Sequence, residues 1–169
     1  GLAAADCRSP ERLPDMVATL GRAVGMPFGI SAGQAWECEP KIELSHYHQA
    51  KTGALFVAAT SCGAAAAGVD SMAWRTLGER IGEAYQIADD IRDAVSNPDT
   101  IGKPVGKDEA LGRPSAVREL GLDGAIARLR GLIEDGIDTI PACPGRDLLS
   151  LLILEETKRF LPKELQRAA

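Results

Sequence analysis

Apolar residues recur at helical spacing through almost all of this 169-residue chain, and no other feature constrains the fold as much. The stretch "SHYHQAKTGALFVAATSCGAAAAG" (45–68) aligns small and apolar side chains on one helical face. A second stripe runs through residues 72–95. Strand-like alternation is absent, and runs of β-branched residues are short. The sequence therefore predicts an all-α fold in which small residues let neighbouring helices approach closely.

Turn residues divide this pattern into separate helices. A first stripe comprises Leu13, Val17, Leu20 and Val24. It is followed by "GMPFGISAGQ" (25–34), which indicates a break and then close backbone packing. Asp70 or Ser71 offers an N-cap for a later helix. That helix should stop near "SNPD" (96–99), where asparagine and proline favour a turn.

Two more helices are expected in the last third of the chain. Asp123 could cap the first, and "PACPG" (141–145) separates it from "RDLLSLLILEETKRFLPKEL" (146–165). Before them, "TIGKPVGKDEALGRPS" (100–115) has the composition of a loop. Loops of this length in compact domains are usually either functional or disordered.

Composition excludes some classes of partner. The net charge is −5 and the chain has no lysine or arginine run, so nucleic acid is not expected as a main partner. No membrane-spanning helix is expected, because no apolar run is long enough. The four cysteines are Cys7, Cys38, Cys62 and Cys143. Their wide spacing favours reduced thiols in a cytoplasmic protein.

The stretch "YQIADDIRD" (85–93) places three carboxylates close together on a helix that is otherwise expected to pack. Gln86, Asp89 and Asp93 share one helical row, and Asp90 lies about 100° to the side. Like charges four residues apart repel unless a cation relieves the repulsion. Mg²⁺ prefers such oxygen ligands and combines one or two carboxylates with water and phosphate oxygens. A solvated acidic face is the alternative interpretation of the same residues.

Basic and polar residues elsewhere favour a binding site over a solvated face. Lys103, Lys107 and Arg113 lie in the loop that follows the acidic helix. Lys51 and Thr52 interrupt an earlier stretch of small, apolar residues. Carboxylates that hold Mg²⁺ and lysines that hold phosphate are the two parts of a diphosphate-binding site.

Three segments together resemble a known family. In this order and spacing, "YHQAKTGALFVAATSCGAAAAG", "IGEAYQIADDIRD" and "GKPVGKD" resemble the C-terminal half of the trans-isoprenyl diphosphate synthases, also called polyprenyl synthetases. The resemblance is greatest to the bacterial geranylgeranyl diphosphate synthases of carotenoid pathways. It is strong over residues 21–113 and looser elsewhere, and three linked motifs are far more specific than one.

This resemblance implies an isoprenoid-synthase-type helical bundle around a deep cavity, of which this chain would form a part. It also implies an Mg²⁺-dependent prenyltransferase, commonly a homodimer, that joins an allylic diphosphate to isopentenyl diphosphate and yields geranylgeranyl diphosphate. The C–O bond to the allylic diphosphate breaks, the alkene attacks the resulting cation, and a proton leaves. Stabilisation of the departing diphosphate should supply most of the rate.

The aspartates and two lysines take the charged roles in this resemblance. Asp89, Asp90 and Asp93 match the second aspartate-rich motif, which binds Mg²⁺. Asp89 is expected as a direct ligand and Asp93 as a ligand through water. Lys51 and Lys103 match lysines that contact the allylic diphosphate. A surface lysine whose stem covers apolar neighbours is the alternative interpretation of Lys51.

Four further polar residues match the family's substrate-binding positions. Thr52 and Gln86 match residues at the reaction centre that help the diphosphate take up the departing proton. Gln34 matches the glutamine of a G-G-Q stretch, which reads "SAGQ" here, and Glu37 replaces an aspartate that follows it. Arg113 stands where the family usually has lysine, which keeps the charge but changes its shape. Alternatively, Thr52 bonds to its own helix carbonyl and Gln34 is a helix cap.

The family's first aspartate-rich motif has no match in this chain, and neither do the basic residues that hold isopentenyl diphosphate. We therefore expect residues 1–169 to be the C-terminal portion of one longer all-α domain. Such a portion should be inactive alone and should expose apolar helix faces. Two alternatives remain open. One is a non-catalytic prenyl synthase-like subunit or diphosphate-binding module, and the other is a plain helical bundle with a fortuitous acidic patch.

Overall fold

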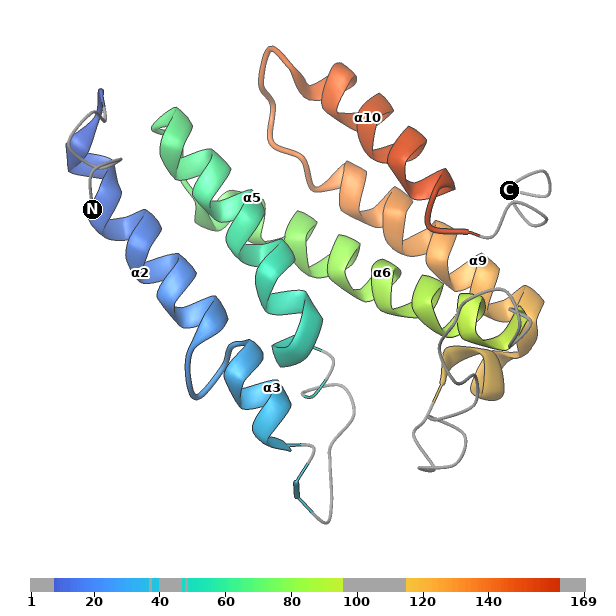
Figure 1. The fold of residues 1–169 in the computed structure, drawn as a ribbon. Coiled ribbons are helices and arrows are strands. Elements are labelled where there is room, and N and C mark those ends of the chain that lie inside the picture. Colours follow the sequence, from blue (N-terminus) through green and yellow to red (C-terminus); the bar gives the residue numbers. More distant parts are fainter. Residues whose placement is uncertain (1–7, 37, 40–46, 48, 96–114, 162–169) are drawn as a thin grey trace.

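The computed structural model describes residues 8–36, 38–39, 47, 49–95 and 115–161, and all regular structure in these residues is helical. The α-helices are α2 (Leu13–Val24), α3 (Ile30–Trp36), α5 (Ala54–Ala67), α6 (Arg75–Val95), α9 (Ala116–Asp138) and α10 (Arg146–Lys158). The shorter elements are the 3₁₀ turns η1 (Pro10–Arg12) and η3 (Met72–Trp74) and the π-helical turn η2 (Gln49–Gly53). The all-α prediction is thereby confirmed (Figure 1).

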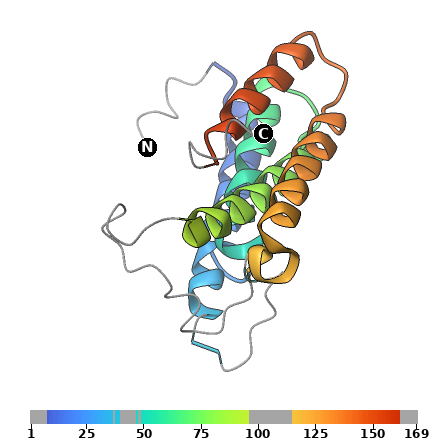
Figure 2. The ribbon, with the colours of Figure 1, turned by 90° about the vertical axis from the view of Figure 1, so that its right-hand side faces the viewer.

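Helix α6 is the centre of the arrangement. It packs against α5 and η2 and against α9, while α2 packs on α5 and α10 packs on α9. Figures 1 and 2 show α10 returning antiparallel along α9 after the connection between them. The helix that carries the predicted carboxylates, α6, therefore packs against elements on both sides of the bundle.

The core lies between α6 and α9. Its buried members are Ala84, Ile87, Ala88, Ile91, Ala125, Leu129, Leu132, Ile133 and Leu161. The largest of those that are almost completely buried are Ile91, Leu129 and Leu132. Burial of one leucine or isoleucine side chain contributes about 1.5–3 kcal/mol relative to exposure, so this core is the main contact that holds α6 and α9 together.

Two glycines let α6 approach the backbones of α5 and η2. A Cβ on Gly78 would lie 2.6 Å from the Cα of Val57, and one on Gly82 would lie 2.9 Å from the Cα of Gly53. Both distances are shorter than van der Waals contact, so any side chain at these positions would push the helices apart. The close approach predicted from the small residues is confirmed at this contact.

One predicted boundary of α6 can be compared with the structure and the other cannot. The description of α6 reaches Val95, and the turn predicted at "SNPD" (96–99) lies outside the described residues. Asp70 acts as a cap, because its Oδ1 accepts a hydrogen bond of 2.9 Å from the amide of Met72. The turn η3 follows this cap, so α6 itself begins only at Arg75. Of the loop predicted at 100–115, all but the last residue lies outside the described residues.

The N-cap predicted at Asp123 is wrong. α9 begins at Ala116, with Ser115 as the N-cap, and Asp123 lies inside the helix. The helix bends at Gly121, where φ is 72° and ψ is 169°, a conformation that glycine adopts without steric cost. The apolar stripe after Asp123 therefore predicted only the second and longer part of α9, which follows Gly121.

Helices α2 and α10 leave apolar side chains in solvent. On α2, Val17 is 66% exposed, and on α10 Leu148 is 74% and Leu151 60% exposed. Where such side chains adjoin one another, exposed apolar surface commonly marks a place where a partner binds. The predicted exposure of apolar helix faces is confirmed. None of the described helices has the length and apolarity that crossing a membrane requires.

Candidate functional site

The acidic row lies on the last turns of α6 and faces away from the core. The buried residues of this segment are Ile87, Ala88 and Ile91. By contrast, Gln86, Asp89 and Asp90 are half-buried and Asp93 is exposed. The helical pattern therefore separates the apolar side from the carboxylate side as predicted.

Thr52 and Gln86 meet at the contact between η2 and α6, although 34 residues separate them. The Thr52 hydroxyl donates a hydrogen bond of 3.2 Å to Oε1 of Gln86. The hydroxyl thus joins two elements, rather than bonding to its own helix carbonyl. This contact places the lysine–threonine segment against the acidic helix, one turn before Asp89.

Lys51 precedes Thr52 in η2 and is half-buried. Its ammonium group donates a hydrogen bond to the hydroxyl of Tyr47 and lies 4.9 Å from the centroid of the same ring. Tyr47 is only 4% exposed, so the ring is a buried support for the cation. A cation above an aromatic face gains electrostatic attraction. These contacts disfavour the interpretation of Lys51 as an ordinary surface lysine.

The "SAGQ" stretch forms part of α3, which packs directly on η2. A Cβ on Gly33 would lie 2.7 Å from the Cα of Lys51, so only glycine allows this approach. Gln34 follows on the exposed side of α3. The structure therefore brings two of the predicted segments, 31–34 and 51–52, into contact.

Asp89 forms an ion pair that sequence reasoning missed. Nη2 of Arg92 lies 2.6 Å from Oδ1 of Asp89, and Cζ of Arg92 lies 5.5 Å from the ring centroid of Tyr85. Burial lowers the pKa of Arg92, but hydrogen bonding with Tyr85 and the charge of Asp89 outweigh burial and raise this pKa above its ordinary value. The i,i+3 spacing of Asp89 and Arg92 was the available signal.

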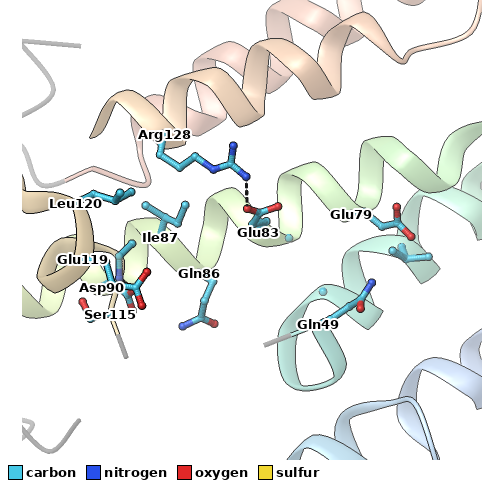
Figure 3. Close-up of a pocket in the computed structure, with 14 residues that line it drawn as sticks. Gln49, Glu79, Glu83, Gln86, Ile87, Asp90, Ser115, Glu119, Leu120 and Arg128 are labelled. Carbon is cyan, nitrogen blue, oxygen red and sulfur yellow. Dashed lines mark hydrogen bonds and ion pairs between the residues drawn. The ribbon is translucent and has the colours of Figure 1, made fainter. Parts of the chain in front are cut away.

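Asp90 contacts a different element from Asp89. Its Oδ2 accepts a hydrogen bond of 2.8 Å from the backbone amide of Ala116, at the start of α9. Figure 3 shows Asp90 beside Ser115 and Glu119, where α9 begins next to α6. The two adjacent carboxylates therefore have different partners, one on their own helix and one 26 residues along the chain.

A cleft of about 450 Å³ lies between η2, α5, α6 and the start of α9. Gln86 and Asp90 line it, together with Gln49, Glu83 and Arg128 (Figure 3). Arg128 spans from α9 to α6 through a 2.7 Å ion pair with Glu83. Sequence reasoning indicated Gln86 and Asp90 but missed Gln49, Glu83 and Arg128. The signal available on α6 was the helical spacing of the four polar residues that line the cleft, which are Glu79, Glu83, Gln86 and Asp90.

Two predicted site residues, Lys103 and Arg113, lie outside the described residues. Among the residues that the structure does describe, no three histidine, cysteine, aspartate or glutamate side chains are grouped so that they could hold a metal ion. The donor chemistry of the acidic row fits Mg²⁺, which takes only one or two carboxylates and completes its shell with water and phosphate oxygens. Asp89 and Asp93, one helical turn apart, offer such a pair.

Comparison with solved structures supports the fold. The structure of a geranyltransferase from Helicobacter pylori complexed with magnesium and isoprenyl diphosphate superposes with a TM-score of 0.72 and 23% identity, and the match covers 92% of this chain and 55% of that one. A geranylgeranyl pyrophosphate synthetase from Pyrococcus horikoshii matches with a TM-score of 0.65 and 22% identity over 89% of this chain and 61% of that one. The described helices thus have the isoprenyl synthase fold that the resemblance implied.

Comparison with curated proteins identifies the family. Geranylgeranyl diphosphate synthase from Cereibacter sphaeroides is 48% identical over 163 residues, which are 96% of this chain and 57% of the relative. The synthase of that name from Rhodobacter capsulatus is 48% identical over 86% of this chain and 50% of the relative. The chain thus spans about half the length of the curated relatives it matches. The polyprenyl synthetase family model matches residues 5–137. The chain belongs to the polyprenyl synthetase family.

Proposed function

We propose that this chain supplies part of the active site of an Mg²⁺-dependent trans-prenyltransferase of isoprenoid and carotenoid biosynthesis. The reaction condenses an allylic diphosphate with isopentenyl diphosphate, and its product is geranylgeranyl diphosphate. The observation that carries the proposal is the hydrogen bond between Thr52 and Gln86, which joins the lysine–threonine segment to the acidic helix. The 48% identity to two geranylgeranyl diphosphate synthases supports the product.

In this proposal the carboxylates bind the metal and the basic residues bind the diphosphate. Asp89 is a direct ligand and Asp93 a ligand through water, while Asp90, the third aspartate of the motif, accepts a hydrogen bond from the start of α9. When bound, Mg²⁺ offsets the charge of the diphosphate as it leaves. Lys51 and Lys103 contact the diphosphate oxygens. The support for Lys51 is its placement on the buried Tyr47 ring beside Thr52.

Four uncharged or basic residues complete the proposed site. Thr52 and Gln86 face the reaction centre and, through their mutual hydrogen bond, orient the diphosphate oxygen that takes up the departing proton. Gln34 and Arg113 bind substrate from α3 and from the segment before α9. Because Gly33 packs on Lys51, Gln34 is held close to the lysine–threonine segment.

The chemistry follows from charge development. The allylic C–O bond breaks and leaves its electron pair on the diphosphate, whose growing negative charge is stabilised by Lys51 and Lys103. The alkene of isopentenyl diphosphate then forms the new C–C bond, and loss of a proton restores a double bond. We propose a cytoplasmic homodimer as the working form, supported by the exposed apolar faces of α2 and α10.

A non-catalytic subunit or diphosphate-binding module is the second candidate function. It would retain the aspartates and Lys51 for binding but would not form product. Assays of condensation with the catalytic partner present distinguish the two, because a binding module supports no product formation of its own.

Magnesium-dependent binding of pyrophosphate to the 169-residue chain tests the proposal by calorimetry. Asp89→Ala should lower the affinity about tenfold or more, since even indirect partners of a bound metal commonly contribute roughly 10- to 100-fold. Asp135→Ala, at an exposed aspartate of α9, is the matched control and should bind like the unchanged chain. Equal loss in both variants, or binding that ignores magnesium, would refute the site. Condensation by this chain alone would show that the first motif is dispensable.

A further inference from the structure

The start of α9 is capped by a residue from another helix. The first amides of an α-helix have no partner within the helix and need an acceptor elsewhere. The N-cap Ser115 is extended, with φ −137° and ψ 138°, and its side chain makes no capping hydrogen bond to the described start of α9. Oδ2 of Asp90 instead accepts from the amide of Ala116 at 2.8 Å. A carboxylate at this end is also favoured by the helix dipole.

This cap acts on a short and separate piece of helix. The non-helical conformation of Gly121 divides the first turns of α9, residues 116–120, from the rest of the helix. A helical segment of this length is not stable on its own, because nucleation costs more than so few hydrogen bonds return. Its position therefore depends on outside contacts, which include the Asp90 bond and the packing of Ala116 and Val117 on the core.

The same short segment forms one wall of the cleft. The cleft is lined on this side by the N-cap Ser115 and by three residues of the segment, which are Ala116, Glu119 and Leu120. Figure 3 shows Ser115, Glu119 and Leu120 gathered beside Asp90. The side chain that accepts from the start of α9 thus joins this wall directly to α6.

We infer that Asp90 is a positioning residue, which fixes the start of α9 and the cleft wall through its bond to the Ala116 amide, and is not a metal ligand. Its role in substrate binding rests on the proposed function, whereas its role in holding α9 does not. Asp89, whose carboxylate pairs with an arginine side chain on its own helix, remains available for exchange with a metal ion. The two adjacent aspartates thus have different roles: Asp89 binds the metal ion and Asp90 positions the start of α9.

Substitution by asparagine separates the two roles of a carboxylate. Asparagine is as good an N-cap as aspartate, because its side-chain oxygen accepts the same hydrogen bond. A metal ligand, in contrast, loses its negative charge in this exchange. Asp90→Asn should therefore keep the function of Asp90, while Asp89→Asn should not keep the function of Asp89. Asp90→Ala removes the acceptor altogether.

The test measures hydrogen exchange at the Ala116 amide and magnesium-dependent pyrophosphate binding in the 169-residue chain. In Asp90→Ala, hydrogen exchange at the Ala116 amide should become about tenfold faster, because loss of a helix cap commonly lowers helix stability by an amount equal to about a tenfold change in the opening equilibrium. In Asp90→Asn, both exchange and pyrophosphate affinity should stay within about threefold of the unchanged chain. Asp89→Asn should leave exchange at Ala116 unchanged and should lose pyrophosphate affinity about tenfold.

Two outcomes would overturn the inference. One is unchanged exchange at Ala116 in Asp90→Ala. The other is a loss of pyrophosphate affinity in Asp90→Asn as large as that in Asp89→Asn, with Ala116 still protected, which would make Asp90 a metal ligand. If Asp90→Ala does not fold, the asparagine variant decides alone. If the unchanged chain binds no pyrophosphate, the proposed function fails while the exchange measurements still decide the capping role.

Discussion

Helices α6 and α10 are both rich in apolar residues, yet they differ in how those residues are used. On α6, Ile91 is completely buried against α9, and Gly78 lets α5 approach to backbone contact. On α10, Leu148 and Leu151 are mostly exposed. An apolar stripe therefore predicts that a helix will pack, but it does not show that the packing partner belongs to the same stretch of chain.

Removal of a core leucine should have the largest effect on stability. Leu132→Ala deletes a side chain that is completely buried between α9 and α6, and it should lower the free energy of unfolding by about 2–5 kcal/mol. Leu151→Ala, on the exposed side of α10, is the matched control and should change this free energy by less than about 0.5 kcal/mol. Urea unfolding followed by circular dichroism measures both. Similar losses in the two variants would show that α10 is also covered.

A single methyl group should have an intermediate effect at the contact between α5 and α6. Gly78→Ala would place a Cβ 2.6 Å from the Cα of Val57, and overpacking of this kind typically costs about 1–3 kcal/mol. Gly63→Ala is the control, because a Cβ there meets no described atom within 4 Å and should stabilise the exposed helix position by about 0.5–1 kcal/mol. Thermal unfolding should thus shift in opposite directions. A stabilising Gly78→Ala would contradict the close contact.

Substitutions on the exposed face of α10 should have the smallest effect on unfolding but a visible effect on association. The double variant Leu148→Ser and Leu151→Ser should unfold within about 0.5 kcal/mol of the unchanged chain, because neither side chain is buried. It should sediment with less self-association and bind less of a hydrophobic dye. The pair Glu155→Ala and Lys158→Ala, at an exposed ion pair of the same helix, controls for polarity. Unchanged self-association would show that the exposed face of α10 does not mediate contacts between copies of the chain.

Much of the fold could be predicted from the sequence, because helical spacing depends only on local periodicity. The capping role of Asp70 followed from cap chemistry. The start of α9 was misplaced at Asp123 because its first turns are separated by Gly121 and are capped from α6. A cap supplied by a residue 26 positions away leaves no local signal.

Sequence reasoning indicated candidate site residues but not the partners that their side chains contact. The resemblance indicated Lys51, Thr52 and Gln86, and the structure brings Thr52 and Gln86 into hydrogen-bond contact. Their proposed chemical roles remain predictions. The pairing of Asp89 with Arg92 was missed although their i,i+3 spacing was a local signal for it. The bond of Asp90 to α9 could not be predicted, because it joins residues 26 positions apart. Lys103 and Arg113 remain predictions, since they lie outside the described residues.

The absence of a side chain at Gly33 has a consequence for evolution at this site. Since the backbone of Lys51 occupies the space that a methyl group would need, mutation at position 33 would displace an ammonium group 18 positions away in the sequence. The backbone of Lys51 therefore limits which residues can replace Gly33 in the "SAGQ" stretch, although the two positions are distant in the sequence. Homologues that alter position 33 should carry compensating changes in the turn that presents the lysine.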